Sequence, residues 1–211
     1  MGKGFWVVLA AVVVIMIGAV MIFGDEAAAP SPEVDDPHEI TDSDFSQGES
    51  DAPITLVKYS DFQCPACGAA AGILEEVKDE YGDDLQFVYR FFNVTDPALT
   101  TRNASLAAIA AGEQGSFWEM HDLLFERQQS WSGDPQARSL FDDYAEELGL
   151  DMEQFDEDFD NGGDRVDRDI GIARQLGVQS TPTFFLNGEQ IQNPMSMEAW
   201  RELLDEELAE A

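Results

Sequence analysis

The sequence predicts an α/β domain behind a single hydrophobic N-terminal segment. An apolar, β-branched run at 53–61 leads directly into a helical pattern, and a second buried strand follows at 85–94. A long helical block then extends to about residue 176. Strand signals return around an Asn187-Gly188 turn, and an amphipathic helix closes the chain. Strands that alternate with helices in this way are typical of an α/β fold.

Residues 5–23 form an uninterrupted apolar stretch. As a helix it would reach roughly 28 Å at about 1.5 Å per residue, close to the thickness of the hydrocarbon core of a bilayer. Signal peptides have shorter apolar cores, of roughly 7–15 residues, so the length favours a retained transmembrane anchor. The small residues of "GDEAAAP" leave a cleaved signal peptide as the alternative. Lys3 precedes the stretch and no Lys or Arg follows before Lys58, so the positive-inside rule assigns residues 1–4 to the cytoplasm.

The segment 24–50 is rich in Asp, Glu, Pro and Ser and has few large apolar residues. It buries too little surface to offset the entropy of ordering, so we expect an acidic, flexible stalk. The remaining residues, 51–211, suffice for one domain with its own core. We therefore expect a single-pass protein of the cell membrane, with its N-terminus cytoplasmic and its domain extracytoplasmic.

The chain is strongly acidic, with 43 Asp and Glu against 11 Lys and Arg and a formal net charge of −32. This charge repels nucleic acids and anionic membrane surfaces, so we expect neither as a partner. The scarcity of lysine favours a high-salt habitat, in which an acidic surface stays soluble under strong screening. An exported domain that is merely acidic is the alternative.

The only two cysteines, Cys64 and Cys67, lie in "SDFQCPACG", directly after the first predicted strand. Pro65 fits the first position of a helix, which makes Cys64 the N-cap residue and puts Cys67 one turn further in. The helix dipole and the free amide groups there favour a thiolate at Cys64, whereas Cys67 is more sheltered. One stabilised sulfur beside a sheltered partner is what thiol–disulfide exchange requires, so the pattern predicts a redox-active Cys64–Cys67 disulfide.

Other uses of the cysteine pair are less well supported. A zinc site needs about four ligands, and beside the cysteines the chain offers only His38 and His121, the first of them in the expected stalk. A structural disulfide would close a loop too short to remove much entropy from the unfolded chain. We therefore expect no metal site, and a metal-binding protein is the weakest alternative.

Some side-chain contacts are also expected from the helical patterns. Trp118 and His121 lie in "SFWEMHDLLFERQ" and are interpreted as packing residues. The last helix is expected to begin after Ser196 as N-cap, with Met195 and Trp200 forming a hydrophobic staple.

Three segments resemble one known family, in the order that the family has them. "SDFQCPACG" resembles the active-site segment of the DsbA-like thiol–disulfide oxidoreductases of bacterial and archaeal envelopes, and "GVQSTPTFFLNG" resembles their cis-proline segment. "GEQGSFWEMHDLLFERQ" resembles a helix of their inserted helical domain. The likeness runs from about Ala52 to Leu204 and is similar in particular to the membrane-anchored members. It implies a thioredoxin fold with an α-helical insertion at about 97–176.

The resemblance also implies roles for individual residues. Cys64 would be the nucleophilic cysteine and Cys67 the resolving one. Pro182 would be the cis-proline packed beside the disulfide, since a cis peptide is rare except before proline. It would turn the backbone of Thr181 outward, where it can pair with an extended substrate chain.

Two positions depart from the family pattern. Many members have an acidic residue six positions before the first cysteine, where this chain has Lys58. A nearby ammonium favours thiolate, but it accepts no proton at neutral pH unless its own pKa falls. A side chain that simply reaches solvent is the alternative for Lys58. The strongest oxidants have a histidine as the second residue between the cysteines, where this chain has Ala66, so the redox potential and the direction of the reaction stay open.

The sequence thus predicts an extracytoplasmic enzyme that oxidises cysteine pairs of exported proteins through the Cys64–Cys67 disulfide and a mixed disulfide. The resemblance implies a membrane quinone-linked partner that restores the disulfide, and no organic cofactor or metal. A reductase or isomerase with the same site is one alternative, and a non-catalytic thioredoxin-like module that binds clients is another. Replacing Cys64 separates the last from the enzymes, because a binding module would keep its function.

Overall fold

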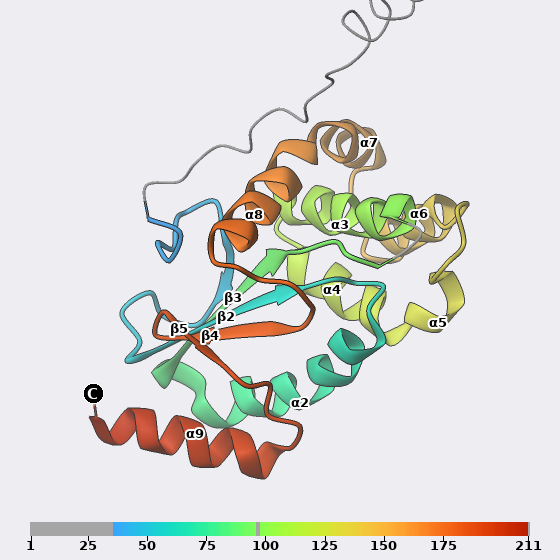
Figure 1. Ribbon diagram of the computed structural model, residues 1–211. Coiled ribbons are helices and arrows are strands. Elements are labelled where there is room, and N and C mark those ends of the chain that lie inside the picture. The colour runs from blue at the N-terminus through green and yellow to red at the C-terminus, as the bar shows by residue number, and fades with distance from the viewer. Residues whose placement is uncertain (1–35, 96–97, 211) are drawn as a thin grey trace, which may run out of the picture. The chain divides into compact units, whose positions relative to one another are not determined.

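The computed structural model describes residues 36–95 and 98–210 (Figure 1). The apolar stretch at 5–23, which is expected to form a membrane anchor, and the first part of the expected stalk lie outside the described residues. Among the residues that are described, no helix is both long and apolar enough to cross a bilayer.

A five-stranded sheet lies at the centre of the fold. Its strands are β1 (Phe45–Gln47), β2 (Ile54–Ser60), β3 (Leu85–Phe91), β4 (Thr183–Leu186) and β5 (Glu189–Ile191). They lie side by side in the order β1-β3-β2-β4-β5. β2 and β3 run parallel, and the other neighbouring pairs run antiparallel. As a result β2 ends, β4 begins and β5 ends at one edge of the sheet, here called the cysteine edge because Cys64 follows β2.

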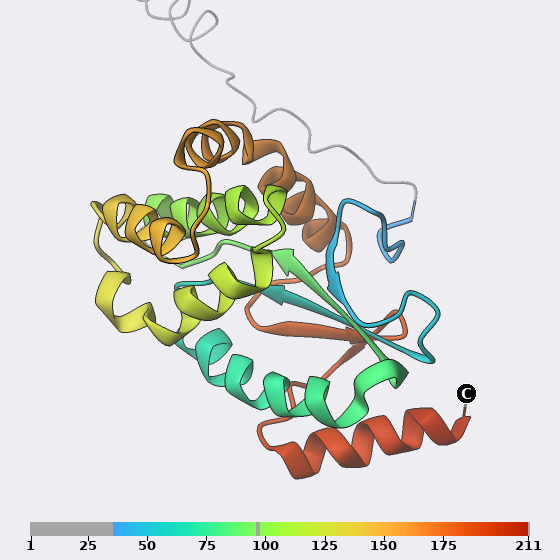
Figure 2. The ribbon, with the colours of Figure 1, turned by 180° about the vertical axis from the view of Figure 1, so that it is seen from behind.

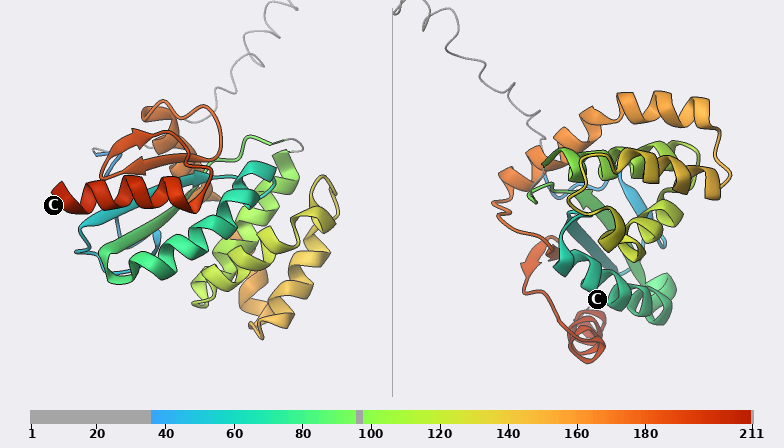
Figure 3. Two further views of the ribbon diagram at one scale, coloured as in Figure 1. Left: turned by 90° about the horizontal axis from the view of Figure 1, so that it is seen from below. Right: turned by 90° about the vertical axis from the view of Figure 1, so that its right-hand side faces the viewer.

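The helices are α2 (Pro65–Tyr81), the 3-10 turn η1 (Gly82–Asp84), α3 (Ala98–Glu113), α4 (Phe117–Glu126), α5 (Gln128–Trp131), α6 (Arg138–Glu147), α7 (Met152–Asn161), α8 (Gly163–Gln175) and α9 (Met197–Glu210). α2 and α9 cover one face of the sheet, and α8 with the segment 36–44 covers the other (Figures 1 and 2). α3 to α7 gather beside the sheet (Figure 3). The expected α/β order is confirmed, although only the first half of α8 packs with the inserted helices and its second half covers the sheet.

The alternation of side chains along β2 decides what each face of the sheet carries. Leu56 packs beneath α2 and α9, where it joins Trp200 in one cluster. Tyr59 lies on the opposite face and packs with Ile172 of α8. Lys58 shares the orientation of Leu56, so the strand directs this lysine under α2 and not towards solvent.

Helix α3 forms the centre of the inserted helices. Its buried face consists of small residues, namely Ala104, Ala107, Ala108 and Ala111. They let α4, α6 and α7 approach closely, and larger side chains such as Phe117 and Phe141 fill the space between them. The same apolar cluster includes Cys67, so the insertion packs directly against the helix that bears the cysteines.

The structure corrects the expected end of the stalk at residue 50. Residues 45–47 form β1, which pairs with β3, and the segment 36–44 lies on the sheet. Arg90 of β3 holds this segment, because its guanidinium donates to both carboxylate oxygens of Asp44 and to the carbonyl of Pro37. The folded domain therefore begins before residue 51. Composition alone missed this because the buried ion pairs of Asp44, and not an apolar run, fix the segment.

Asp44 is the centre of a buried charge cluster. Its carboxylate lies 3.0 Å from Arg90 Nε and 2.6 Å from Arg168 Nη2. Burial alone raises the pKa of Asp44, but the hydrogen bonds and charge of Arg90 outweigh burial and lower it. The carboxylate therefore stays ionised inside the fold.

The last helix begins as expected, and its staple does not form. The amide of Ala199 donates to Ser196 Oγ at 3.3 Å, so Ser196 caps α9. Trp200 is buried, but Met195 is 73% exposed, so the predicted contact between them is wrong. His121 is buried and packs among aromatic rings, as expected for a packing residue.

We expect Asp44→Ala to lower the free energy of unfolding by about 3–5 kcal/mol at pH 7, because it leaves Arg90 buried without its carboxylate. The effect should be full above pH 3.8, the ordinary pKa of the carboxyl, and should vanish as the pH falls through its lower pKa in the fold. Denaturant unfolding of the full chain measures both. Asp42→Ala, at an exposed neighbour, is the control and should change stability by less than about 0.5 kcal/mol. Equal losses for the two variants would contradict the prediction.

Candidate active site

Helix α2 begins at Pro65, which puts Cys64 at the N-cap and Cys67 in the first turn, as predicted. The amide of Cys64 donates to the carbonyl of Asp61 at 3.0 Å, and the carbonyl of Cys64 accepts from the amide of Cys67 at 3.0 Å. Cys64 is partly exposed and Cys67 is fully buried, and both are free thiols in this structure. The chain therefore presents one sulfur to solvent and encloses the other.

The loop before β4 places Thr181 and Pro182 beside Cys64. The peptide bond between them is cis, which confirms that prediction. Cys64 Sγ donates to the carbonyl of Thr181 at 3.5 Å, although the two residues are 117 positions apart in the chain. The sheet brings Cys64 and Thr181 together, because Thr183 at the start of β4 pairs with Tyr59 near the end of β2.

The two thiols have opposite pKa shifts. A hydrogen bond from the Cys67 thiol is the largest effect on Cys64 and, against burial, lowers the pKa of Cys64 to about 5, with help from the side chain of Thr181. The amides of Ala66 and Cys67 add to this, although no side-chain cap hydrogen bond is closed. Burial, and then the hydrogen bond to Cys64, raises the pKa of Cys67 well above its ordinary value. At neutral pH the reduced pair is therefore one thiolate and one thiol.

Lys58 lies beneath the cysteine helix and is fully buried, so the alternative that it reaches solvent is wrong. Its Nζ donates to the carbonyl of Cys67 at 3.5 Å and lies 4.9 Å from the centre of the Phe125 ring. No carboxylate among the described residues forms an ion pair with it. Burial lowers the pKa of Lys58 to about 8, although negative charge on the cysteine sulfurs acts in the other direction. The condition for proton exchange at neutral pH is thus met.

Two glutamines hold the cysteine loop, and sequence reasoning missed both. Gln128 of α5 donates through Nε2 to the carbonyls of Phe62 at 2.7 Å and Cys64 at 2.9 Å. Gln63 Oε1 accepts from the amide of Gly133 at 3.1 Å. A Cβ at Gly68 would lie 3.2 Å from Gln128 Oε1, which explains the glycine after the second cysteine. No local pattern links these residues, because the contacts join segments more than 60 positions apart.

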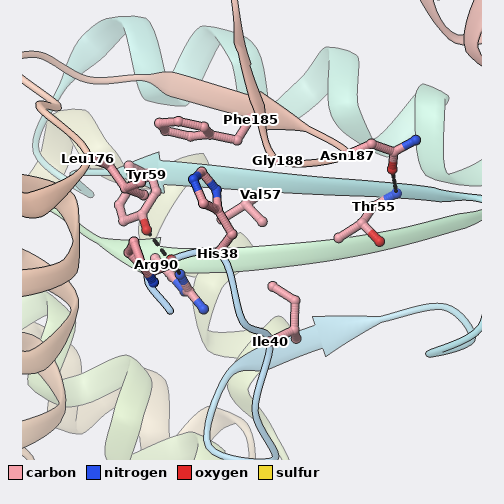
Figure 4. Close-up of a pocket in the computed structure, with 11 residues that line it drawn as sticks. His38, Ile40, Thr55, Val57, Tyr59, Arg90, Leu176, Phe185, Asn187 and Gly188 are labelled. Carbon is pink, nitrogen blue, oxygen red and sulfur yellow. Dashed lines mark hydrogen bonds between the residues drawn. The ribbon is translucent and has the colours of Figure 1, made fainter. Parts of the chain in front are cut away.

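A pocket of about 340 Å³ lies on the opposite face of the sheet (Figure 4). Its floor includes Val57, Tyr59 and Phe185, and His38 stands at its rim with its ring 5.8 Å from that of Phe185. Because side chains alternate along β2, this pocket faces away from Lys58 and the cysteines. His38 and His121 thus lie on opposite faces, and no group of three His, Cys, Asp or Glu that could hold a metal occurs among the described residues.

Residues 41–206 match the family model described as Thioredoxin. The chain belongs to the thioredoxin family. The oxidised BdbD of Bacillus subtilis has a similar structure, with a TM-score of 0.69 and 26% sequence identity over 78% of this chain and 92% of that chain. The thiol-disulfide oxidoreductase MdbA of Corynebacterium diphtheriae gives a TM-score of 0.61 at 23% identity, over 74% of this chain and 85% of its own.

The α-DsbA1 protein of Wolbachia pipientis has the same fold, with a TM-score of 0.72 at 17% identity over 81% of this chain and 94% of that chain. The resemblance of this thioredoxin-family chain to DsbA-like proteins is thereby confirmed, and so is the thioredoxin fold with helical insertion. The finer assignment to a membrane-anchored type depends on residues that are not described.

Curated relatives of higher identity carry a different name. The Na(+)/H(+) antiporter NhaA 3 of Salinispora tropica is 39% identical over 160 residues, which is 75% of this chain and 24% of the antiporter. NhaA of Herminiimonas arsenicoxydans is 36% identical over 168 residues, 79% of this chain and 26% of that protein. The thioredoxin-family chain thus spans about a quarter of the length of these relatives, so their transport activity does not transfer to it.

Replacing Lys58 should stabilise the fold. The difference between its ordinary pKa of 10.5 and its pKa of about 8 corresponds to about 3 kcal/mol spent on burying the ammonium. We expect Lys58→Met to raise the free energy of unfolding by up to about that amount at pH 7. The gain should shrink as the pH rises from about 8 towards 10.5, because folded Lys58 then loses its charge before unfolded Lys58 does.

Urea unfolding of the full chain at pH 7 and pH 10 measures this difference. Lys78→Met is the matched control, because Lys78 has an ion pair with Glu75 at 2.6 Å and should gain nothing from losing its charge. A gain of the same size at both pH values, or in both variants, would refute the effect of burial.

Substitutions at Cys67 should separate its hydrogen bond from its other effects on Cys64. The thiol of Cys67 is the largest cause of the low pKa of Cys64, so Cys67→Ala should move that pKa upward from about 5. Cys67→Ser keeps a donor in place and should leave the pKa of Cys64 closer to 5. Thiolate absorbance at 240 nm, followed against pH, measures both. The assignment is wrong if the alanine and serine variants titrate together.

Proposed function

We propose that this chain is an extracytoplasmic thiol–disulfide oxidoreductase that oxidises cysteine pairs of exported proteins. The observation that carries the proposal is the unequal pair: an accessible Cys64 with a pKa of about 5 above a buried Cys67 whose pKa is raised. A thiol of low pKa is a good leaving group, and it makes the reduced form of the enzyme more stable. A purely structural disulfide has no need of this asymmetry.

The reaction begins when a substrate thiolate attacks Sγ of Cys64 in the oxidised enzyme. The bond between Cys64 and Cys67 breaks, and Cys67 leaves with its electron pair. A mixed disulfide between substrate and Cys64 forms. Because the buried Cys67 has a raised pKa, its sulfur takes up a proton, and the nearby ammonium of Lys58 is suited to supply it.

The second substrate thiolate then attacks the substrate sulfur of the mixed disulfide. Cys64 leaves as a thiolate, the substrate gains a disulfide, and the enzyme carries the two electrons as one thiolate and one thiol. A membrane quinone-linked partner, which the DsbA-like resemblance implies, accepts these electrons and restores the Cys64–Cys67 disulfide. The chain has no third cysteine, so no internal thiol relays them.

We place this chemistry outside the cell. The apolar stretch 5–23 is long enough to anchor the chain, and Lys3 on its N-terminal side favours a cytoplasmic N-terminus. Disulfide formation suits an oxidising compartment, which agrees with export of the domain. In this arrangement a stalk before residue 36 joins the anchor to the folded domain.

The surface around Cys64 favours uncharged substrate segments. In a chain with a net charge of −32, no charged residue occurs in 62–74, which carries the cysteines and the first part of α2, or in 128–133, whose Gln128 binds the carbonyl of Cys64. None occurs either in 177–183 or 190–197, which border the cysteine edge. Met195, in the last of these segments, is 73% exposed. An extended client can pair with the backbone at Thr181 and pack apolar side chains on this surface. Such binding depends little on salt, because it uses no surface ion pairs.

The reduction potential of the full chain, equilibrated with glutathione buffers, tests the direction of the reaction. A value near about −120 mV, as strong oxidants show, is expected for the proposed oxidase. A value near about −270 mV would instead favour a reductase, which is the alternative left open by an alanine, and not a histidine, at position 66. Cys64→Ser should abolish oxidation of a reduced client protein. If Cys64→Ser keeps its effect on client proteins, the enzyme is ruled out and the non-catalytic binding module is the remaining function.

A further inference from the structure

Several polar atoms lie buried beneath Cys67 without a hydrogen-bond partner among the described residues. They are Ser60 Oγ, Tyr89 Oη and His121 Nε2. Lys58 Nζ has one long hydrogen bond, to the carbonyl of Cys67 at 3.5 Å. Buried polar groups are almost always paired with protein or internal water, so three unpartnered atoms near a lysine with one long hydrogen bond form a set that internal water would satisfy.

These groups lie on one side of the buried sulfur. Ser60 Oγ is close enough to act on both Cys67 and Tyr89, although neither pair has full hydrogen-bond geometry. Lys58 Nζ and the His121 ring each lie 4.9 Å from the centre of the Phe125 ring. The rings of Tyr89 and His121 are 5.3 Å apart. The buried lysine, serine, tyrosine and histidine thus surround one small region between the sheet and α4.

His121 connects this region to the surface. Its Nδ1 lies 2.7 Å from Asp122 Oδ1, and the Asp122 side chain is 46% exposed. A carboxylate at this position makes Nδ1 the protonated nitrogen, which leaves the lone pair of Nε2 for the interior. Burial, with the positive charges of Lys58 and Lys78, lowers the pKa of His121 to about 4 despite Asp122, so the ring is neutral at pH 7 and takes up a proton at Nε2 only as Nδ1 releases its own.

We propose that His121 and Asp122 form the outlet of a proton path that joins Cys67 and Lys58 to solvent through internal water. The inference rests on the proposed function. When the disulfide is restored, the sulfur of Cys67 attacks Cys64, whose bond to the departing oxidant thiolate breaks. The proton of Cys67 passes by Lys58 or Ser60 and water to His121 Nε2, while the proton on Nδ1 passes to Asp122 and solvent. The reverse transfers protonate Cys67 when it leaves during substrate oxidation.

Reoxidation of the reduced full chain by oxidised glutathione separates the two sulfur steps. In the first step the Cys64 thiolate forms a mixed disulfide with glutathione, and in the second Cys67 displaces it. Acid quenching followed by mass spectrometry measures both rates. We expect His121→Gln to slow the second step at least about tenfold, so that the mixed disulfide accumulates, and to leave the first step unchanged. Asp122→Asn should slow the second step as well.

Glu119→Gln is the matched control, because it removes an equal charge from an exposed position of the same helix and should change neither step. Should His121→Gln fail to fold, the surface variant Asp122→Asn carries the test. Wild-type second-step rates in both variants would overturn the proton outlet. Equal slowing of both steps, or a shift of the thiolate titration at 240 nm, would overturn it in favour of a structural role for His121. A wild-type chain that forms or resolves no mixed disulfide would instead refute the proposed function.

Discussion

The enclosure of Cys67 is the constraint on which the site depends. Its sulfur is buried between β2, the first turn of α2 and the inserted helices, while Cys64, three residues earlier, stays at the end of the helix. Burial disfavours a thiolate at Cys67, so the negative charge of the reduced pair collects on Cys64, where the Cys67 thiol, the side chain of Thr181 and the helix amides stabilise it. A more open Cys67 would share that charge, and the two sulfurs would lose their separate roles.

The inserted helices contribute to this enclosure and so affect the chemistry of the cysteines. The rings of Phe125 and His121 of α4 pack over Lys58, and Gln128 of α5 donates a hydrogen bond to the carbonyl of Cys64. A five-stranded sheet with α2 and α9 alone would leave this side of the cysteine loop open to water. The insertion therefore supplies the low-dielectric surroundings in which the pKa of Lys58 falls, and it fixes the loop that carries the first cysteine.

Local patterns predicted the parts of the fold that local forces decide. Pro65 after a strand marks the start of α2, and the Asn187-Gly188 turn, with φ values of 46° and 86°, sets the hairpin. The order of the segment 36–44 was missed because it depends on Arg90, 46 positions beyond Asp44. Gln128 was missed for the same reason. The burial of Lys58 was open to prediction, since alternation along β2 gives it the orientation of Leu56, but its charge argued for solvent.

The lysine at position 58 and the alanine at position 66 act in opposite directions on the redox balance. A family member with a buried carboxylate beneath the disulfide adds negative charge to a site that becomes negative on reduction. Lys58, with a pKa of about 8, is mostly an ammonium at pH 7, so its charge favours the reduced pair. Ala66 gives up the stabilisation that a histidine would add. Because Lys58 is fully buried, dissolved ions screen its effect far less than that of a surface charge. Lys58 therefore keeps its effect on the reduced pair at ionic strengths that would cancel the effect of a surface charge.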